Sequence, residues 1–180
     1  DTPLELIPSR PTLTAVRRSK DVLVSIEPFP KGELSLMLSD DSPQRIRLVQ
    51  FDAKHREIAR IVSEKGISVP RGGEQRLLEG LAAIAPLLTV HSDIGGGAGV
   101  AATVPSDPRP HLHLHTFDGG LGLECYVHPG GDAGPQFRPG QGATTLFSER
   151  DGQPVCYTRD LRGEATAARA VISQCPALDG

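Results

Sequence analysis

Aromatic residues are scarce in this chain of 180 residues: they make up 4% of the sequence, and tryptophan is absent. The core must therefore be built from Leu, Ile, Val and Ala side chains. No apolar run approaches the roughly 20 residues that a membrane-spanning helix needs, and no signal peptide is visible. The composition is otherwise that of a globular protein, with one domain or two small ones.

Positive charge is not in excess, because 19 Lys and Arg face 22 Asp and Glu, for a net charge of -3. This excludes nucleic-acid binding by bulk charge but leaves a local basic face open. The planar fork of Arg suits phosphate contacts. The alternative is a solvated face balanced by acidic neighbours. The candidates for a basic face on adjacent strands are Arg17, Arg18, Lys20, Arg45 and Arg47.

Cysteine is also infrequent: Cys125, Cys156 and Cys175 form an odd count without a CxxC pair. This predicts three reduced thiols in a cytosolic protein. A bridge between Cys125 and Cys156 stays open, because both are expected on neighbouring strands. The chain opens without an initiator Met, and we expect a piece of a longer protein.

The first half of the sequence predicts strands followed by helices. Alternating apolar residues indicate a meander with one buried face, made of residues 12–18, 21–27, 33–39 and 45–51. Asp52 is a predicted helix N-cap, and Gly66 ends that helix. A second helix is expected over residues 74–85, followed by a short strand over 87–91.

The second half predicts two β-hairpins, because alternating segments flank Gly-rich turns. Their strands are residues 111–117, 121–128, 144–149 and 154–158, and Asp160 caps a final helix. We therefore predict an α+β protein. Residues 1–104 would form the meander with two helices, and residues 105–180 a double hairpin covered by the C-terminal helix.

His111, His113 and His115 alternate along one predicted strand, so their side chains share one face. Neutral imidazoles arranged in this way can bind Zn, Ni or Fe. Ordinary strand residues, with Leu112 and Leu114 facing the core, are the alternative. The further metal ligand would come from the partner strand, where the candidates are Glu124, Cys125 and His128.

No other motif predicts catalysis. His91, Ser92 and Asp93 have the residue types of a hydrolase triad, but neighbours on an extended chain point apart. The glycine run at residues 95–99 and the loop at residues 138–142 do not match a Walker phosphate loop.

The second half also contains a series of phrases in a fixed order: LLTVHSDIGG, then HLHLHTFDGGLGLECYVHPGG, then GPQFRPGQGATTLFSERDGQPVCYTRD and ISQCPAL. This series resembles a region of large bacterial helicase-like ATPases of the Swi/Snf type, where it lies N-terminal to the motor. The resemblance covers about residues 85–180, and the segments RIRLVQFDAKHREIARIV and ISVP fit more loosely.

The resemblance implies a cytoplasmic parent protein that couples ATP hydrolysis to movement on duplex DNA. The motor's phosphate loop, acidic Mg-binding box and arginine finger are absent from these 180 residues, so no catalytic residue is carried over. ATP and Mg²⁺ would belong to the motor, and this segment would have no cofactor. Its implied role is a non-catalytic contact with DNA, a partner or the motor itself.

Two other classes of function stay open. One is a metal-dependent enzyme or metal-binding barrel that uses His111, His113 and His115. The other is a protein-interaction module that docks partners on exposed strand edges.

Overall fold

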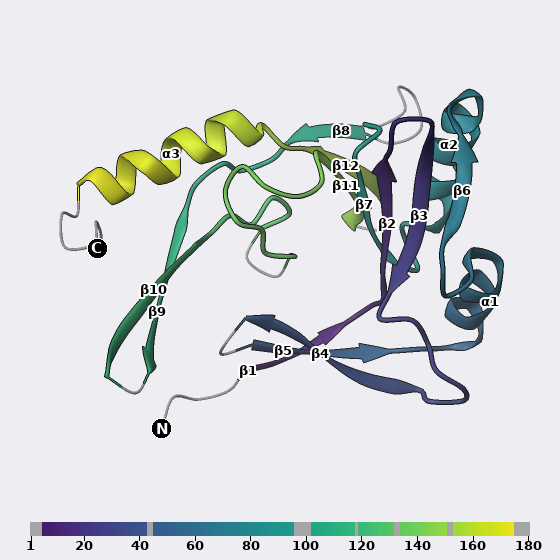
Figure 1. Cartoon of the computed structure of the whole chain (residues 1–180), viewed down its shortest axis with the longest axis horizontal. Helices are drawn as coiled ribbons and strands as arrows, with labels where there is room; N and C mark the ends of the chain where they lie inside the picture. The colour runs from purple at the N-terminus through teal and green to yellow at the C-terminus, as the bar shows by residue number, and fades with distance from the viewer. Residues whose placement is uncertain are drawn as a thin grey trace.

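The computed structural model describes residues 5–42, 45–95, 102–117, 119–131, 134–150 and 153–174. Within these residues the chain forms three β-sheets and three α-helices, with one short 3₁₀ helix at Arg71–Gly73 (Figure 1). The predicted α+β class is confirmed. None of the helices in these ranges is long and apolar enough to cross a membrane.

The largest sheet has seven strands in the order β6-β3-β2-β7-β11-β12-β8. The strands are β2 (Thr12–Arg17), β3 (Asp21–Glu27), β6 (Ile67–Pro70), β7 (Thr89–Ser92), β8 (Ala102–Pro105), β11 (Thr145–Arg150) and β12 (Gln153–Thr158). β7 pairs with β2 and with β11, so strands from both halves of the chain share one sheet. The predicted boundary between residues 1–104 and 105–180 falls within β8, a strand of this sheet.

One face of this main sheet carries the hydrophobic core. Side chains alternate along each strand, so Leu13, Val24, Val90 and Phe147 all lie on this face. The helices α1 (Ala53–Val62) and α2 (Glu74–Ile84) cover it with their apolar stripes. We call the opposite face of the main sheet, which α1 and α2 do not cover, its open face.

A smaller sheet has the order β1-β5-β4, formed by β1 (Glu5–Ser9), β4 (Leu36–Ser42) and β5 (Arg45–Gln50). The four strands predicted as one meander are thus divided, because β2 and β3 belong to the main sheet. Pro28 and Pro30 follow β3 directly and lack the N–H that a ladder needs. The free edge of β3 pairs instead with β6, a short strand between the two predicted helices.

The third sheet is the hairpin of β9 (His111–Phe117) and β10 (Gly120–Tyr126), which extends away from the main sheet (Figure 1). The other predicted hairpin, β11 and β12, is antiparallel and lies inside the main sheet. The last helix, α3 (Leu161–Ser173), begins where Asp160 accepts a hydrogen bond from the Gly163 N–H. It borders β10 across a shallow groove lined by both elements.

Candidate functional site

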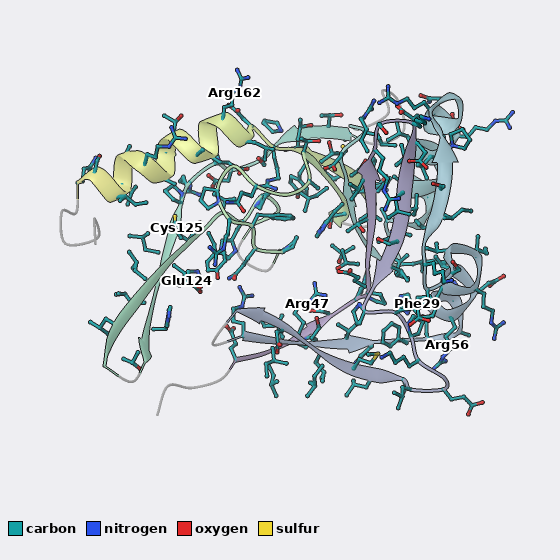
Figure 2. All side chains as sticks on the ribbon, in the orientation of Figure 1. Phe29, Arg47, Arg56, Glu124, Cys125 and Arg162 are labelled. Atoms are coloured by element: carbon teal, nitrogen blue, oxygen red, sulfur yellow. The ribbon has the colours of Figure 1, made fainter. Side chains whose placement is uncertain are left out.

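The five predicted basic residues lie in two separate places. Arg17, Arg18 and Lys20 lie at the turn between β2 and β3, whereas Arg45 and Arg47 lie on β5. Arg47 lies between the small sheet and the main sheet (Figure 2), where it contacts Thr12 at the other end of β2. At about 3.3 Å per residue, β2 separates the two groups by about 16 Å.

The first group is extended by Arg71, whose Nη2 donates to the Arg18 carbonyl at 3.2 Å. We call Arg17, Arg18, Lys20 and Arg71 the hairpin-tip cluster. All four residues are exposed. Arg17 pairs with Glu74 at 3.1 Å and keeps 41% of its side chain accessible. This end of the main sheet therefore presents several cations to solvent.

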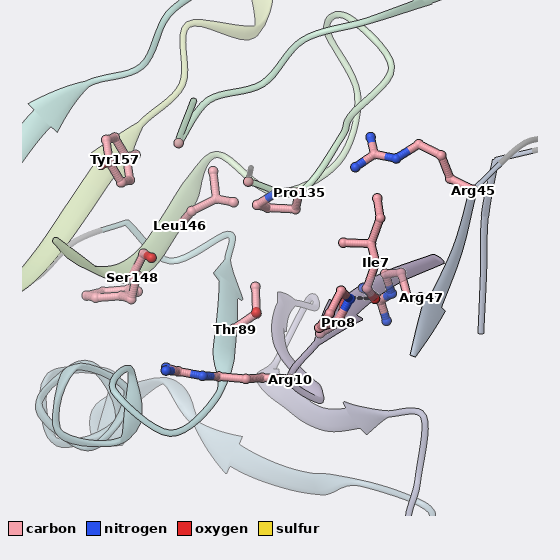
Figure 3. Close-up of a pocket in the computed structure, with 14 residues that line it drawn as sticks. Ile7, Pro8, Arg10, Arg45, Arg47, Thr89, Pro135, Leu146, Ser148 and Tyr157 are labelled. Carbon is pink, nitrogen blue, oxygen red and sulfur yellow. Dashed lines mark hydrogen bonds between the residues drawn. The ribbon is translucent and has the colours of Figure 1, made fainter. Parts of the chain in front are cut away.

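The second group lines a cavity of about 340 Å³ that we call the arginine cleft. It lies between the small sheet, the open face of the main sheet and the loop that contains Pro135 (Figure 3). Its lining includes Arg10, Arg45 and Arg47, and the described residues of the lining include no Asp or Glu. Arg10 could not be predicted from the sequence, since an isolated cation between Ser9 and Pro11 carries no pattern.

Strand periodicity places the side chains of this cleft. On β5, Arg45 and Arg47 are two residues apart and therefore share a face. On the main sheet, Leu146, Phe147 and Ser148 all contribute to the lining, and the side chain of Phe147 packs in the core. Because side chains alternate along β11, the same strand contributes to the core and to the wall of the cleft that faces β5.

The arginines differ in their bonding. The Arg45 side chain is 12% exposed and its Nε lies 3.5 Å from Glu5 Oε2. Arg10 donates a hydrogen bond to the Pro86 carbonyl. Arg47 donates from Nη1 to Thr12 Oγ1 at 3.3 Å, and its Nε is buried without a hydrogen-bond partner in the described part of the chain. The carboxylate of Glu5 thus offsets part of the charge of Arg45.

His91 lies on β7, where it is the cross-strand partner of Leu146 of β11. Burial lowers the pKa of His91 to about 4, and the charges of Arg47 and Arg159 act in the same direction. Its Nε2 is buried and has no hydrogen-bond partner among the described residues. His91 therefore stays neutral near pH 7 in a region of positive potential.

No catalytic triad is formed by His91, Ser92 and Asp93. Ser92 is fully buried, and its hydroxyl accepts a hydrogen bond from the Ile94 N–H at 3.2 Å. His91 lies on the opposite side of the strand, as adjacent positions require. The serine has a structural role in the turn after β7.

The three predicted histidines share one face of β9, opposite Tyr126, Glu124 and Gly122 of β10. His111 and His113 contact the buried His128, with ring centroids 4.5 and 6.1 Å apart. Within the described residues, no group of three or more His, Cys, Asp or Glu side chains is arranged to hold a metal ion.

The side chains around this row are engaged with one another. Burial is the main cause that lowers the pKa of His113. The candidate ligand Glu124 accepts a hydrogen bond from the Tyr126 hydroxyl at 2.7 Å and lies 3.6 Å from Arg138. His115 lies across Gly122, where a Cβ atom would be 2.2 Å from His115 Nε2. On the face of β9 and β10 that carries the histidines, the polar and aromatic side chains thus pack against one another.

The glycine-rich loop at residues 138–142 does not form a phosphate loop. The Gly140 N–H donates to the Glu164 carboxylate at 3.1 Å, so an internal anion already occupies the loop at residues 138–142. Residues 96–99 of the other glycine run lie outside the described residues.

The described cysteines are free thiols. Cys125 lies on β10 and Cys156 on β12, in two different sheets, and no bridge joins them. Burial raises the pKa of both thiols. Cys175 lies outside the described residues.

Comparison of the chain with protein-family models, with curated proteins and with solved structures finds no match.

Proposed function

We propose that this chain is a non-catalytic accessory domain of a Swi/Snf-type DNA-dependent ATPase, and that it contacts duplex DNA through the hairpin-tip cluster. The sequence resemblance over the second half of the chain supports the class of parent protein. In this proposal ATP and Mg²⁺ are bound by the motor in the same cytoplasmic protein. The domain engages the DNA on which that motor acts.

One observation carries the DNA contact: Arg17, Arg18, Lys20 and Arg71 are exposed together at one end of the main sheet. A duplex is a stiff rod whose phosphates lie on its outside, so it is reached by protruding side chains. A tight β-turn, closed by the Arg18 N–H and the Asp21 carbonyl at 2.8 Å, holds the cations in place. Phosphate contacts of this kind position a protein without reading sequence.

Arg45 and Arg47 fit a duplex less well than the tip does. The Arg45 side chain is only 12% exposed, and both residues line a recessed cavity. A duplex passing the mouth of the cleft would meet β1 and the loop at Pro135 first. We therefore assign the main duplex contact to the hairpin-tip cluster.

The test is duplex binding by the purified chain, measured by fluorescence anisotropy between 50 and 200 mM salt. We expect non-specific affinity that falls steeply with salt. The double variant Arg17→Ala plus Arg18→Ala should weaken binding and lower the salt slope by about two, since each lost phosphate contact contributes about one.

Arg162→Ala is the matched control, because Arg162 projects from α3 away from the rest of the molecule (Figure 2). It removes one positive charge far from the tip, against two in the double variant, and should leave duplex affinity nearly unchanged. Undetectable binding at 50 mM salt, or equal losses in both variants, would contradict a DNA contact through the tip.

A protein-interaction role is the second candidate, favoured by one apolar face of the β9–β10 hairpin. Leu112, Leu114 and Leu121 are 40%, 65% and 71% exposed on the side opposite the histidines. Exposed apolar patches of this kind mark interaction sites. In this candidate the partner is the motor of the parent protein. Leu114→Glu should then weaken co-purification of the chain with a separately expressed motor, without changing duplex affinity.

A further inference from the structure

The arginine cleft has properties that a contact with duplex DNA at the hairpin tip does not use. Its volume of about 340 Å³ falls within the range of roughly 300–1,000 Å³ that is typical of small-molecule pockets. Three of its lining residues are arginines, and none of the lining residues in the described part of the chain is acidic. A cavity with this charge favours an anionic ligand small enough to enter.

The guanidinium of Arg47 has few bonding partners in the described part of the chain. A guanidinium carries five N–H donors, but Arg47 makes a single side-chain hydrogen bond in the described part of the chain, to Thr12. Its buried Nε has no partner there. A buried donor on a charged group costs free energy when it is left unpaired, and an oxyanion in the cleft would remove this cost.

The opposite wall suits the rest of a ligand that carries such an anion. The lining includes the hydroxyl-bearing side chains of Thr89, Ser148 and Tyr157. Leu146 and the Tyr157 ring add apolar surface at the same wall (Figure 3). A few polar groups on a partly apolar wall are the usual features of a site that orients a small molecule.

We infer that the arginine cleft binds a phosphate group carried by a molecule of about nucleotide size, with Arg47 as the principal phosphate ligand and Arg45 beside it. The forked guanidinium matches two phosphate oxygens at once. A terminal phosphate carries about -1.5 to -2 charges at pH 7, so it suits several arginines better than a carboxylate does. The same chemistry is offered by a free nucleoside monophosphate and by the 5′-phosphate end of a DNA strand.

His91 supplies a reporter for this site. Burial and the charges of Arg47 and Arg159 hold its pKa at about 4. A phosphate bound against Arg47 would offset part of that positive potential. By linkage, the pKa of His91 should then rise in the bound state.

The experiment is an NMR titration of the His91 ring against pH, with three probes in turn. These are inorganic phosphate, a nucleoside 5′-monophosphate and the same nucleoside without its phosphate. We expect the pKa of His91 to rise with the first two probes and to stay unchanged with the third. Calorimetry with the same probes gives the affinities.

Two substitutions test the location. Arg47→Gln should weaken binding of the nucleoside monophosphate about tenfold or more, the usual effect of losing a charge-assisted hydrogen bond. Ser148→Asp places a carboxylate on the exposed part of the wall and should weaken binding similarly. Ser148→Asn is its isosteric neutral control and should bind like the original chain. Because Ser148 is exposed, this pair keeps the test decisive even where Arg47→Gln unfolds the protein.

Three results would overturn the inference: no response of His91 to either phosphate probe, equal binding of the nucleoside with and without its phosphate, or equal affinities of the Ser148→Asp and Ser148→Asn variants. Single-stranded oligonucleotides with and without a 5′-phosphate distinguish the two sources of the phosphate group, a DNA end and a free nucleotide. A preference for the phosphorylated end assigns the site to DNA ends. Equal binding of both, with the mononucleotide bound, assigns it to a free small molecule.

Discussion

Arg159 and Glu164 form an ion pair in which both side chains are fully buried, with Arg159 Nη2 2.6 Å from Glu164 Oε2. A second bond, from Nε to Oε1 at 2.9 Å, makes the contact bidentate. The remaining Arg159 donor, Nη1, reaches the carbonyls of Gln141 and Ala143. The pair thus joins the end of β12, the loop at residues 138–143 and the first turns of α3.

Glu164→Gln should destabilise the protein by about 3–5 kcal/mol, because it leaves the Arg159 charge buried without its carboxylate. The free energy of unfolding from urea titration measures the effect. Arg162→Gln, on the exposed side of the same helix turn, should change it by less than about 0.5 kcal/mol. A loss below about 1 kcal/mol in Glu164→Gln would contradict the structural role of the pair.

Acid should destabilise the protein through His91. Its pKa falls from 6.5 in the unfolded chain to about 4 in the folded one, so the unfolded state binds more protons between these values. The contribution to stability is complete above pH 6.5 and is lost as the pH falls towards 4. It amounts to about 3.5 kcal/mol at most, from about 1.4 kcal/mol per pKa unit.

His91→Gln removes this titration. The difference in unfolding free energy between the original protein and the variant should therefore shrink as the pH is lowered from 7.5 to 4.5. Urea titrations at four pH values measure it. A difference that stays constant over this range would show that His91 is not held neutral by the fold.

Two glycines form a matched pair for a test of packing. Gly66 and Gly32 both have positive φ, at 80° and 57°, where side chains are strained. A Cβ on Gly66 would lie 2.7 Å from the Val24 carbonyl oxygen, whereas one on Gly32 meets nothing within 4 Å. Gly66→Ala should therefore lower the melting temperature well beyond Gly32→Ala, which carries only the backbone strain of about 1–2 kcal/mol. Equal losses of melting temperature in the two variants would show that the destabilisation comes from backbone strain alone.

The N-terminus of α1 offers a fourth stability test. Asp52 accepts a hydrogen bond from the His55 N–H at 2.9 Å, and His55 Nδ1 accepts one from the Asp52 N–H. Hydrogen bonding by the His55 backbone lowers the pKa of Asp52. Asp52→Ala should cost about 1 kcal/mol, and Asp52→Asn much less, since Asn also caps helices. Equal effects of the two variants in urea unfolding would argue against the cap.

The two proposed sites should be separable by cross-testing. Arg17→Ala plus Arg18→Ala should leave mononucleotide binding unchanged, because about 16 Å of β2 separates the tip from the cleft. Arg47→Gln should leave duplex affinity nearly unchanged, because Arg47 is recessed. If either variant weakens both kinds of binding about equally, the arginines act as one continuous anion-binding surface.

Local signals in the sequence determined most elements of this protein. Alternation predicted β3 and β9 with their observed bounds, and the caps Asp52 and Asp160 began α1 and α3 as expected. These features depend on neighbours a few residues apart, which is why one chain segment suffices to predict them. The short strands β1, β6 and β8 were missed, because each has four or five residues and contains a proline.

Only the tertiary structure decided which strands became neighbours and which cations shared a site. β7 joined β2 to β11 across more than fifty residues of sequence, which placed strands from both halves in one sheet. Arg10 and Arg47 line one cleft, although nothing in the sequence around either residue links it to the other. Strand pairing and cavity shape arise from contacts between distant segments, and local periodicity carries no information about which segments those are.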